Sequence, residues 1–402
     1  MSLNETPKGE RVHIGIFGRR NVGKSSLINA ITSQDIAVIS DTPGTTTDLV
    51  NKAMELLPIG PVLFIDTPGF DDIGDLGKLR VDKTKEALRR IDIAVVVLSA
   101  ETPINEEDIE FINNLKEKNI PYIICINKID LSTSYKSNFN ELSAKEKVIY
   151  ISTKTSEGIG ALKDEIISLY NVDNKRYLVS DIVDPFDTVV LVIPIDESAP
   201  KGRLILPQQQ VIRDLLEASC SVVVTKDTEL ENTLSKLTDK PKLVITDSQV
   251  FNKVSKIVPE NVYLTSFSIL MARYKGDLEW QVDGVKAIEK LENGSKVLIS
   301  EGCTHHRQCA DIGTVKIPTW IKEYTGKKLE FYFTSGGEFP EHVSEYDMII
   351  HCGGCTLNEK EMKYRIELAR KEKVPITNYG ILISYINGIL KRSLDLLTYK
   401  GK

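Results

Sequence analysis

The side chains best suited to chemistry in this 402-residue chain gather near its C-terminal end. Four of its six cysteines, Cys303, Cys309, Cys352 and Cys355, fall within 53 residues. Thiolates and imidazoles are ligands of soft and borderline metals, so this concentration predicts a metal centre. The same stretch holds four of the five histidines, which are His305, His306, His342 and His351.

Three of these thiols are the expected ligands. Cys352 and Cys355 form a C-x2-C pair whose glycines allow a tight turn, and Cys303 follows a neighbouring predicted strand. Zinc would take the three thiolates and one histidine in a closed tetrahedral site. A 4Fe–4S cluster would take the same three and leave one iron for an exchangeable ligand. The donor types leave both chemistries open. A structural disulfide is disfavoured in a chain without an export signal.

The other cysteines and histidines carry weaker signals. Cys125 and Cys220 lie in apolar, strand-like contexts and are expected in the core. Cys309 is either a fourth ligand or a thiol beside a helix, and His306 is either a hydrogen-bond donor behind the ligands or exposed. Surface and loop positions are expected for His13 and His342.

A second chemical motif lies near the N-terminus. The segment Gly18–Ser25, GRRNVGKS, has the GxxxxGKS pattern and follows an apolar run that predicts a strand. Its backbone N–H groups would surround phosphates at the start of a helix. Lys24 is expected to contact the β- and γ-phosphates and Ser25 to bind Mg²⁺. Arg19 and Arg20 lie within the loop and are expected in solvent or against the nucleotide, rather than as arginine fingers. The expected nucleotide contacts of this loop are Gly18, Asn21, Val22, Gly23, Lys24, Ser25 and Ser26.

Three further motifs follow in order, each at the end of a predicted strand. In Asp66-Thr67-Pro68-Gly69, Asp66 would hold Mg²⁺ through its water shell and Gly69 would offer an N–H to the γ-phosphate. In Asn127-Lys128-Ile129-Asp130, the Asp130 carboxylate can accept two hydrogen bonds from guanine that adenine lacks. Ser152-Thr153-Lys154 is expected to support the base. Four ordered motifs at four strand ends indicate a GTPase domain.

The finer pattern resembles one group of GTPases. Thr42–Asp48, TPGTTTD, resembles the switch segment of the TrmE–Era group. The resemblance implies that Thr46 completes the magnesium shell in the GTP state and that Asn21 marks dependence on K⁺. Phe70 stands where Ras-like enzymes carry a water-orienting glutamine, and phenylalanine cannot hydrogen-bond to water. Slow hydrolysis, assisted by K⁺ in place of an arginine finger, is therefore expected.

The elements that must position these motifs alternate along the chain. Short β-branched runs alternate with helix-like segments, which predicts βαβ units and a mainly parallel sheet. Lys52–Leu57 would be an antiparallel edge strand. Two later blocks repeat the alternation, so the fold class expected is α/β throughout. In the first block the predicted strands are Val12–Phe17, Val62–Ile65, Ile93–Leu98, Tyr122–Ile126 and Val148–Ile151.

Composition narrows the classes of protein. The chain has 51 basic and 57 acidic residues, a net charge of −6, and 41% hydrophobic residues. These values argue against disorder and against a protein that coats nucleic acid. No run approaches the 18 apolar residues of a membrane span, and the polar N-terminus lacks a secretory signal. No nucleic-acid or membrane partner is expected, and the cytoplasm is the expected location.

The whole combination resembles the HydF family of GTPases, which mature FeFe-hydrogenase. The specific part is Cys303-Thr304-His305 followed by His351-Cys352-Gly353-Gly354-Cys355 behind a TrmE–Era-type domain. The resemblance implies that Cys303, Cys352 and Cys355 bind a 4Fe–4S cluster with an open or labile fourth position. His305 and His351 match the family motif and would be weak ligands or neighbours that tune the cluster.

The resemblance also implies a scaffold or carrier. A diiron subcluster precursor would be assembled on the chain and handed to apo FeFe-hydrogenase, with two radical-SAM maturases as partners. A homodimer would form through the middle domain. The expected domains are a GTPase domain at 1–172, an α/β dimerisation domain at 173–265 and a cluster-binding domain at 266–402.

A second class of function stays open. It is a K⁺-dependent TrmE–Era-type GTPase in tRNA modification or ribosome assembly that carries a structural zinc module. The net charge of −6 and the lack of a basic, aromatic-interleaved segment count against it.

Overall fold

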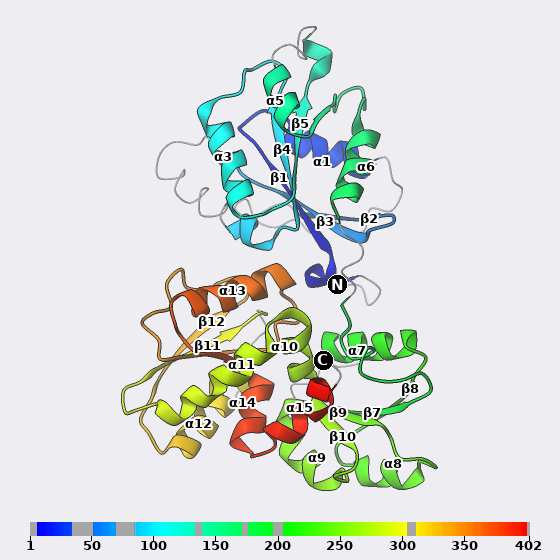
Figure 1. The fold of residues 1–402 in the computed structure, drawn as a ribbon, viewed down its shortest axis with the longest axis vertical. Helices are drawn as coiled ribbons and strands as arrows, with labels where there is room; N and C mark the ends of the chain where they lie inside the picture. The colour runs from blue at the N-terminus through cyan, green and yellow to red at the C-terminus, as the bar shows by residue number, and fades with distance from the viewer. Residues whose placement is uncertain are drawn as a thin grey trace. The chain divides into compact units, whose positions relative to one another are not determined.

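The computed structural model divides the chain into two compact units, 1–175 and 176–402 (Figure 1). No helix within the described parts is long and apolar enough to cross a membrane. The α/β class expected throughout is confirmed. The structure describes residues 6–33, 51–69, 84, 86–132, 139–170, 176–195, 204–303 and 311–399.

The first unit is built on one six-stranded sheet with the order β2-β3-β1-β4-β5-β6. Only β2 among its described strands runs antiparallel, beside β3, as expected for the edge of a mixed sheet. All the other neighbours are parallel, so the ends of β1, β3, β4 and β5 meet at one edge. The strands are β1 (Val12–Phe17), β2 (Asn51–Leu56), β3 (Gly60–Asp66), β4 (Ile93–Ser99), β5 (Tyr122–Asn127) and β6 (Val148–Tyr150).

Helices cover both faces of this sheet. Alternate residues of the strands point to opposite faces, which is why Val95 and Val96 belong to different apolar clusters. Leu27 and Leu162 pack on one face, and Phe111 packs on the other. A parallel sheet needs this double cover because both of its faces are apolar. The described helices are α1 (Lys24–Ser33), α3 (Glu106–Glu117), α5 (Asn140–Lys145) and α6 (Ile159–Leu169).

The second unit begins with a parallel four-stranded sheet in the order β10-β9-β7-β8. β8 is an edge strand, and its side chains are exposed or half-buried, whereas the inner strand β9 is buried along its whole length. The strands are β7 (Thr188–Val192), β8 (Ser221–Thr225), β9 (Leu243–Thr246) and β10 (Tyr263–Ser266). The helices between them are α7 (Leu206–Glu217), α8 (Leu230–Lys236) and α9 (Phe251–Ile257).

A second parallel sheet in this unit has the order β12-β11-β13-β14. The short strand β14 was not among the expected strands, because three residues after Pro375 carry too little pattern to indicate one. The strands are β11 (Lys296–Glu301), β12 (Glu330–Ser335), β13 (Met348–His351) and β14 (Ile376–Asn378). The helices are α10 (Phe267–Lys275), α11 (Leu278–Gly284), α12 (Ile317–Thr325), α13 (Glu359–Lys371), α14 (Tyr379–Ile386) and α15 (Leu390–Tyr399).

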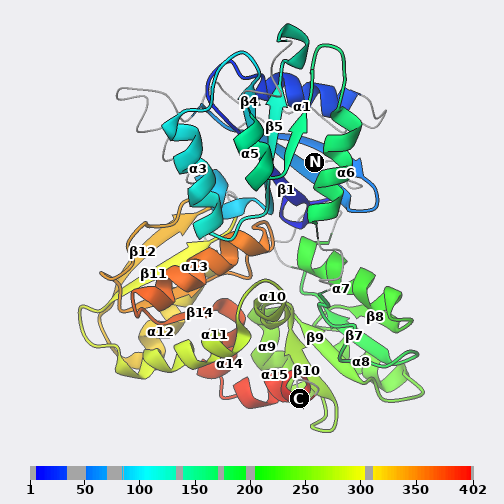
Figure 2. The same ribbon diagram turned by 45° about the horizontal axis from the view of Figure 1, so that its top comes forward.

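The two sheets of the second unit share one apolar core. Buried residues from β7 and β9 pack in the same cluster as residues from β11 and β13. Helix α10 follows β10 directly and contributes Leu270 and Met271 to this cluster, so it joins the two sheets (Figure 2). Short 3-10 helices lie at Lys8–Glu10, Ile129–Leu131, Ser248–Val250 and Val285–Lys290, and a short π-helix lies at Ile312–Lys316.

Candidate nucleotide site and cysteine centre

The phosphate loop leaves β1 and enters α1 through two glycines at positions where a side chain would be strained. Gly18 has φ +146° and Gly23 has φ +97°, in the region that side chains rarely adopt. A Cβ on Gly18 would collide with the carbonyl oxygen of Val97, and one on Gly23 would collide with the Asn127 amide. The loop therefore packs its backbone directly against the neighbouring strand ends.

Lys24 folds back over its own loop. Its Nζ donates to the carbonyls of Gly18 at 2.9 Å and Arg19 at 2.8 Å. The ammonium group thus lies beside the loop backbone whose N–H groups are the expected phosphate ligands. Ser26, two residues after Lys24, is exposed.

Ser25 and Asp66 come together as a pair of oxygen ligands. The Ser25 hydroxyl donates to Asp66 Oδ2 at 2.5 Å, although the two residues are 41 positions apart. Burial raises the pKa of the Asp66 carboxyl, and the Ser25 bond and the Lys24 charge oppose that rise. A hydroxyl and a carboxylate in contact fit Mg²⁺, which takes oxygen ligands. Gly69 closes this described segment, and Thr46, Phe70 and the rest of Thr42–Asp48 lie outside the described residues.

The expected base-binding loops are tied to the phosphate loop by Asn127. Its amide nitrogen donates to the Val22 carbonyl at 2.9 Å, and its amide oxygen accepts the Thr153 N–H at 3.1 Å. The buried Ser152 hydroxyl donates to Asp130 Oδ1 at 2.7 Å. This bond orients the carboxylate that is expected to recognise guanine. The motifs at the ends of β1, β5 and β6 are therefore brought together.

Two basic side chains near these loops have partners in the protein. Lys128, with φ +66°, donates to Glu101 at 2.8 Å, while Lys154 is exposed. Arg19 pairs with the buried Asp108 at 3.1 Å, because the buried carboxylate on α3 needs a cation. Contact of Arg19 with the nucleotide stays a prediction. A hollow of about 140 Å³ beside this pair is lined in part by Asn21 and Lys128.

The three expected cysteine ligands lie at the ends of adjacent parallel strands. Cys303 follows β11, and Cys352 and Cys355 follow β13, which pairs with β11. Cys352 Sγ accepts backbone N–H groups from Gly302 at 3.0 Å and Gly354 at 3.3 Å. Such bonds favour a thiolate, the form that binds metal.

The thiols influence one another electrostatically. Burial raises the pKa of Cys303, and the charges of Cys352 and Cys355 raise it further. Burial and Cys355 raise the pKa of Cys352 to about 12. Because burial disfavours the thiolates of Cys303 and Cys352, a cationic iron centre bound there would stabilise the ionised form that binds metal. The donor set therefore fits an iron–sulfur cluster, whose irons each take a separate cysteine.

No group of three or more His, Cys, Asp and Glu side chains in the described ranges is arranged to hold a single metal ion. Thr304, His305, His306 and Cys309 lie outside those ranges, so the expectations for them stay predictions.

His351 is buried behind the cysteine turn with both ring nitrogens engaged. Nδ1 contacts the Cys352 carbonyl at 2.8 Å, and Nε2 contacts Arg365 Nη1 at 2.9 Å. Because a carbonyl only accepts and a guanidinium only donates, Nδ1 carries the proton and Nε2 accepts. Burial and the Arg365 charge lower the pKa of His351 to about 3, so the ring is neutral at physiological pH. In this arrangement the ring supports Cys352 through its backbone.

Arg365, which sequence reasoning missed, organises the strand ends. Its side chain is fully buried and donates to Glu361 at 2.9 Å, Gly336 O at 2.9 Å and Ser300 Oγ at 3.3 Å. The guanidinium also lies 4.9 Å from the centre of the Phe339 ring. The Glu361–Arg365 spacing of four residues was the available signal, but it is also typical of exposed helix pairs.

Three of the four other cysteines and histidines in the described segments lie where the sequence predicts. Cys125 and Cys220 are buried in apolar clusters or against them, as expected. His342 is exposed in a loop, as expected. His13 is only 6% exposed and its Nε2 donates to the Lys8 carbonyl at 2.8 Å, so the expected surface position was wrong. The turn Lys8–Glu10 covers this ring, which strand patterning does not reveal.

Comparison with known families assigns all three parts of the chain. Residues 13–128 match the model of a 50S ribosome-binding GTPase. Residues 178–276 match the hydrogen maturase F dimerization domain, and residues 279–396 match the hydrogen maturase F tetramerization domain. The GTPase domain expected from the four motifs is confirmed, and so is the resemblance to HydF.

Individual relatives resemble the first unit. The tRNA modification GTPase MnmE of Clostridioides difficile (strain 630) is 37% identical over 156 residues, which is 38% of this chain and 33% of the relative. MnmE of Aquifex aeolicus (strain VF5) is 33% identical over 159 residues, or 39% and 34% of the two chains. The chain thus spans about a third of the length of these curated relatives.

Parts of the chain are also similar to solved structures. Era in complex with MgGDPNP and a segment of 16S ribosomal RNA has a TM-score of 0.35 and 19% identity, over 54% of this chain and 93% of that one. The G domain of the T. maritima FeoB iron transporter has a TM-score of 0.32 and 21% identity, over 40% of this chain and 99% of that one.

Proposed function

Because the chain belongs to the hydrogen maturase F family, we propose that it is a GTP-hydrolysing scaffold in the maturation of FeFe-hydrogenase. It would hold a 4Fe–4S cluster, accept a diiron subcluster precursor as cargo and deliver it to apo-hydrogenase. Radical-SAM maturases would be its partners, and it would self-associate through the domains that match the dimerization and tetramerization models. The cytoplasm is its proposed location.

The GTPase part of the proposal rests on the hydrogen bonds that connect the loops at the ends of β1, β5 and β6. Asp130, oriented by Ser152, would accept the guanine N–H groups, and Gly18–Ser26 would surround the phosphates. Ser25 and Asp66 would hold Mg²⁺, with Thr46 completing the shell, and Mg²⁺ would neutralise charge on the phosphate oxygens when bound. Asn21 would bind K⁺, which would take the place of an arginine finger.

The cluster part rests on one observation: Cys303 follows β11, Cys352 and Cys355 follow the adjacent strand β13, and the three thiols influence one another electrostatically. Cys303, Cys352 and Cys355 would each bind one iron, and the cluster would supply an exchangeable iron position for the cargo. The chain's own contribution is to hold the sulfurs in place: two backbone N–H groups bind Cys352 Sγ, and His351 binds the Cys352 carbonyl.

Reconstitution with iron and sulfide under anaerobic conditions tests the cluster. The wild-type chain should bind about four irons and show a cluster EPR signal on reduction. Cys352→Ser should lose most of both. Cys220→Ser is the matched control, because Cys220 is a cysteine of the same unit outside the centre and should leave the iron content unchanged. A colourless wild-type protein that binds zinc stoichiometrically would contradict the proposal.

Hydrolysis and delivery need separate assays. GTP hydrolysis should be slow and should be faster in K⁺ than in Na⁺ buffers; equal rates would refute the K⁺ site. Chain prepared with its maturases should activate apo-hydrogenase, measured as hydrogen evolution, and Cys352→Ser should not.

The alternative role in tRNA modification draws support from the MnmE relatives, but that similarity is confined to the GTPase part. RNA binding by the full chain would favour it.

A further inference from the structure

A buried lysine lies under the cysteine turn. Lys275, the last residue of α10, is only 2% exposed. Its Nζ donates to the carbonyl of Leu357 at 2.8 Å and to that of Cys355 at 3.1 Å. Burial of an ammonium group is unfavourable unless hydrogen bonds and nearby negative charge compensate for it, so such residues are rare in cores. The buried ammonium group of Lys275 is therefore best explained by a role in the cysteine centre, whose backbone it contacts.

The two cysteines of the C-x2-C turn are held by different elements. Cys352 is held from its own sheet, by the N–H groups of Gly302 and Gly354. Cys355 is held from α10, through the Lys275 bond to its carbonyl. The turn between them is tight, since Gly354 has φ +62° and a Cβ there would collide with Met362. Lys275 therefore fixes the part of the turn that contains Cys355.

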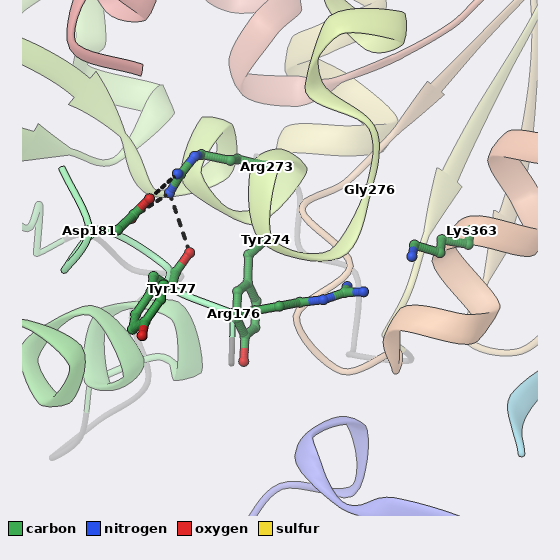
Figure 3. Close-up of a pocket in the computed structure, with 7 residues that line it drawn as sticks. All are labelled: Arg176, Tyr177, Asp181, Arg273, Tyr274, Gly276 and Lys363. Carbon is green, nitrogen blue, oxygen red and sulfur yellow. Dashed lines mark hydrogen bonds and ion pairs between the residues drawn. The ribbon is translucent and has the colours of Figure 1, made fainter. Parts of the chain in front are cut away.

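The end of α10 is itself anchored, so the ammonium group has a defined place. Two residues before Lys275, Arg273 donates to Asp181 Oδ1 at 2.9 Å and to the Tyr177 carbonyl at 3.3 Å (Figure 3). A pocket of about 370 Å³ lies beside this anchor and is lined in part by Arg273, Tyr274 and Gly276. Arg273 and Lys275 thus both hold the end of the helix through hydrogen bonds to other segments.

We propose that Lys275 is a positioning residue that sets the reduction potential of the cluster as well as the place of Cys355. Three thiolates make the centre anionic, and reduction adds one more negative charge. A fixed positive charge hydrogen-bonded to the backbone of a ligand stabilises the reduced state, because cluster potentials depend on net charge and nearby hydrogen bonds. The inference rests on the proposed cluster.

Lys275 also lies in a different matched domain from the cysteines. It falls within residues 178–276, which match the dimerization model, whereas Cys303, Cys352 and Cys355 fall within 279–396. The potential of the cluster is therefore tuned from the neighbouring domain, through a helix that begins at the end of β10.

Two substitutions separate the charge of Lys275 from its hydrogen bonds. Lys275→Gln keeps an N–H donor for the turn carbonyls but removes the charge, and Lys275→Met removes both. Lys286→Met removes a charge from an exposed lysine of the same unit and serves as the control. The midpoint potential of the reconstituted cluster is measured by EPR-monitored titration, together with the iron content.

We expect Lys275→Gln to bind as much iron as the wild type and to shift the potential to a more negative value. Lys275→Met should shift it in the same direction and bind less iron, and Lys286→Met should leave both unchanged. A wild-type potential in both Lys275 variants would overturn the inference. Absence of a cluster from the wild-type chain would instead overturn the proposed function.

Discussion

Arg365 donates a hydrogen bond from Nη1 to Nε2 of His351 at 2.9 Å, inside the sheet that carries the cysteines. The bond leaves His351 with its other nitrogen on the Cys352 carbonyl at 2.8 Å. A guanidinium on a helix thus determines which way an imidazole on a strand faces, and the imidazole supports a ligand's backbone. Both ring nitrogens of His351 are thus engaged by the protein, which favours a supporting role over ligation.

Loss of the Arg365 side chain should destabilise the second unit. Arg365→Met leaves the Glu361 carboxylate buried without its cation, so the free energy of unfolding should fall by about 3–5 kcal/mol. Arg213→Met removes a pair of the same spacing that is exposed and should change it by less than about 0.5 kcal/mol. Urea denaturation of the two variants gives the comparison. Equal effects would show that burial of the Arg365 pair does not matter.

Replacement of His351 should leave the cluster ligands in place. His351→Gln keeps a polar side chain at the site, so the reconstituted chain should retain most of its iron, in contrast to Cys352→Ser. Any imidazole ¹⁴N coupling in pulsed EPR of the reduced cluster should be the same in His351→Gln and the wild type. A coupling that disappears in His351→Gln would identify His351 as a ligand and contradict the arrangement in the structure.

Asp130 should control the choice of base. Asp130→Asn removes a charged acceptor of two hydrogen bonds, each worth about 1.5–3 kcal/mol, so GTP affinity should fall by about 100-fold or more. The introduced amide N–H can donate to the 2-oxo group of xanthine, so xanthosine triphosphate should bind the variant better than GTP does. Fluorescent-nucleotide competition measures both affinities. Unchanged preference for GTP would place the base elsewhere.

The close approach at Gly23 should matter more than its backbone angle. Gly23→Ala places a methyl group against the Asn127 amide and should lower GTP hydrolysis by about 100-fold, as a displacement of about 1 Å can do. Gly60 has a similar φ of +93° but open space around its Cα. Gly60→Ala should therefore cost only about 1 kcal/mol of stability and leave hydrolysis intact. Comparable losses of hydrolysis would contradict this account.

Stability of the second unit should depend on the ionisation of Glu372. The N–H groups of Val343 and Ser344 bind its Oε2 at 2.6 and 2.7 Å, and they lower its pKa below the ordinary 4.5. The ionised form is favoured in the folded state, so its stabilisation is present above pH 4.5 and is lost as the pH falls through the folded-state pKa.

Glu372→Gln should therefore be less stable than its parent at neutral pH, and the difference should shrink in acid. The comparison belongs in a His342→Asn background, which removes the imidazole that contacts Oε1 at 3.2 Å. Urea unfolding at neutral pH and at about pH 3.5 measures it. A difference that stays constant with pH would show that the carboxylate charge plays no part.

The local chemistry of both sites could be predicted from the sequence. The GxxxxGKS loop and the C-x2-C turn work through neighbours in the chain, so their glycines, thiols and spacing predict how the backbone turns. The alternation of apolar runs predicts parallel sheets, and parallel strands bring the loops that follow them to one edge. The meeting of Ser25 with Asp66, and of Cys303 with Cys352 and Cys355, follows from that rule.

Which polar residues hold the site loops in place depends on tertiary packing. Glu361–Arg365 and Arg213–Glu217 look alike in the sequence, yet one pair is buried and the other is exposed. Lys275 reaches carbonyls about 80 residues away, and Arg19 finds Asp108 on another element. Burial depends on how sheets and helices pack against one another over long separations, and no local pattern of residues encodes that packing.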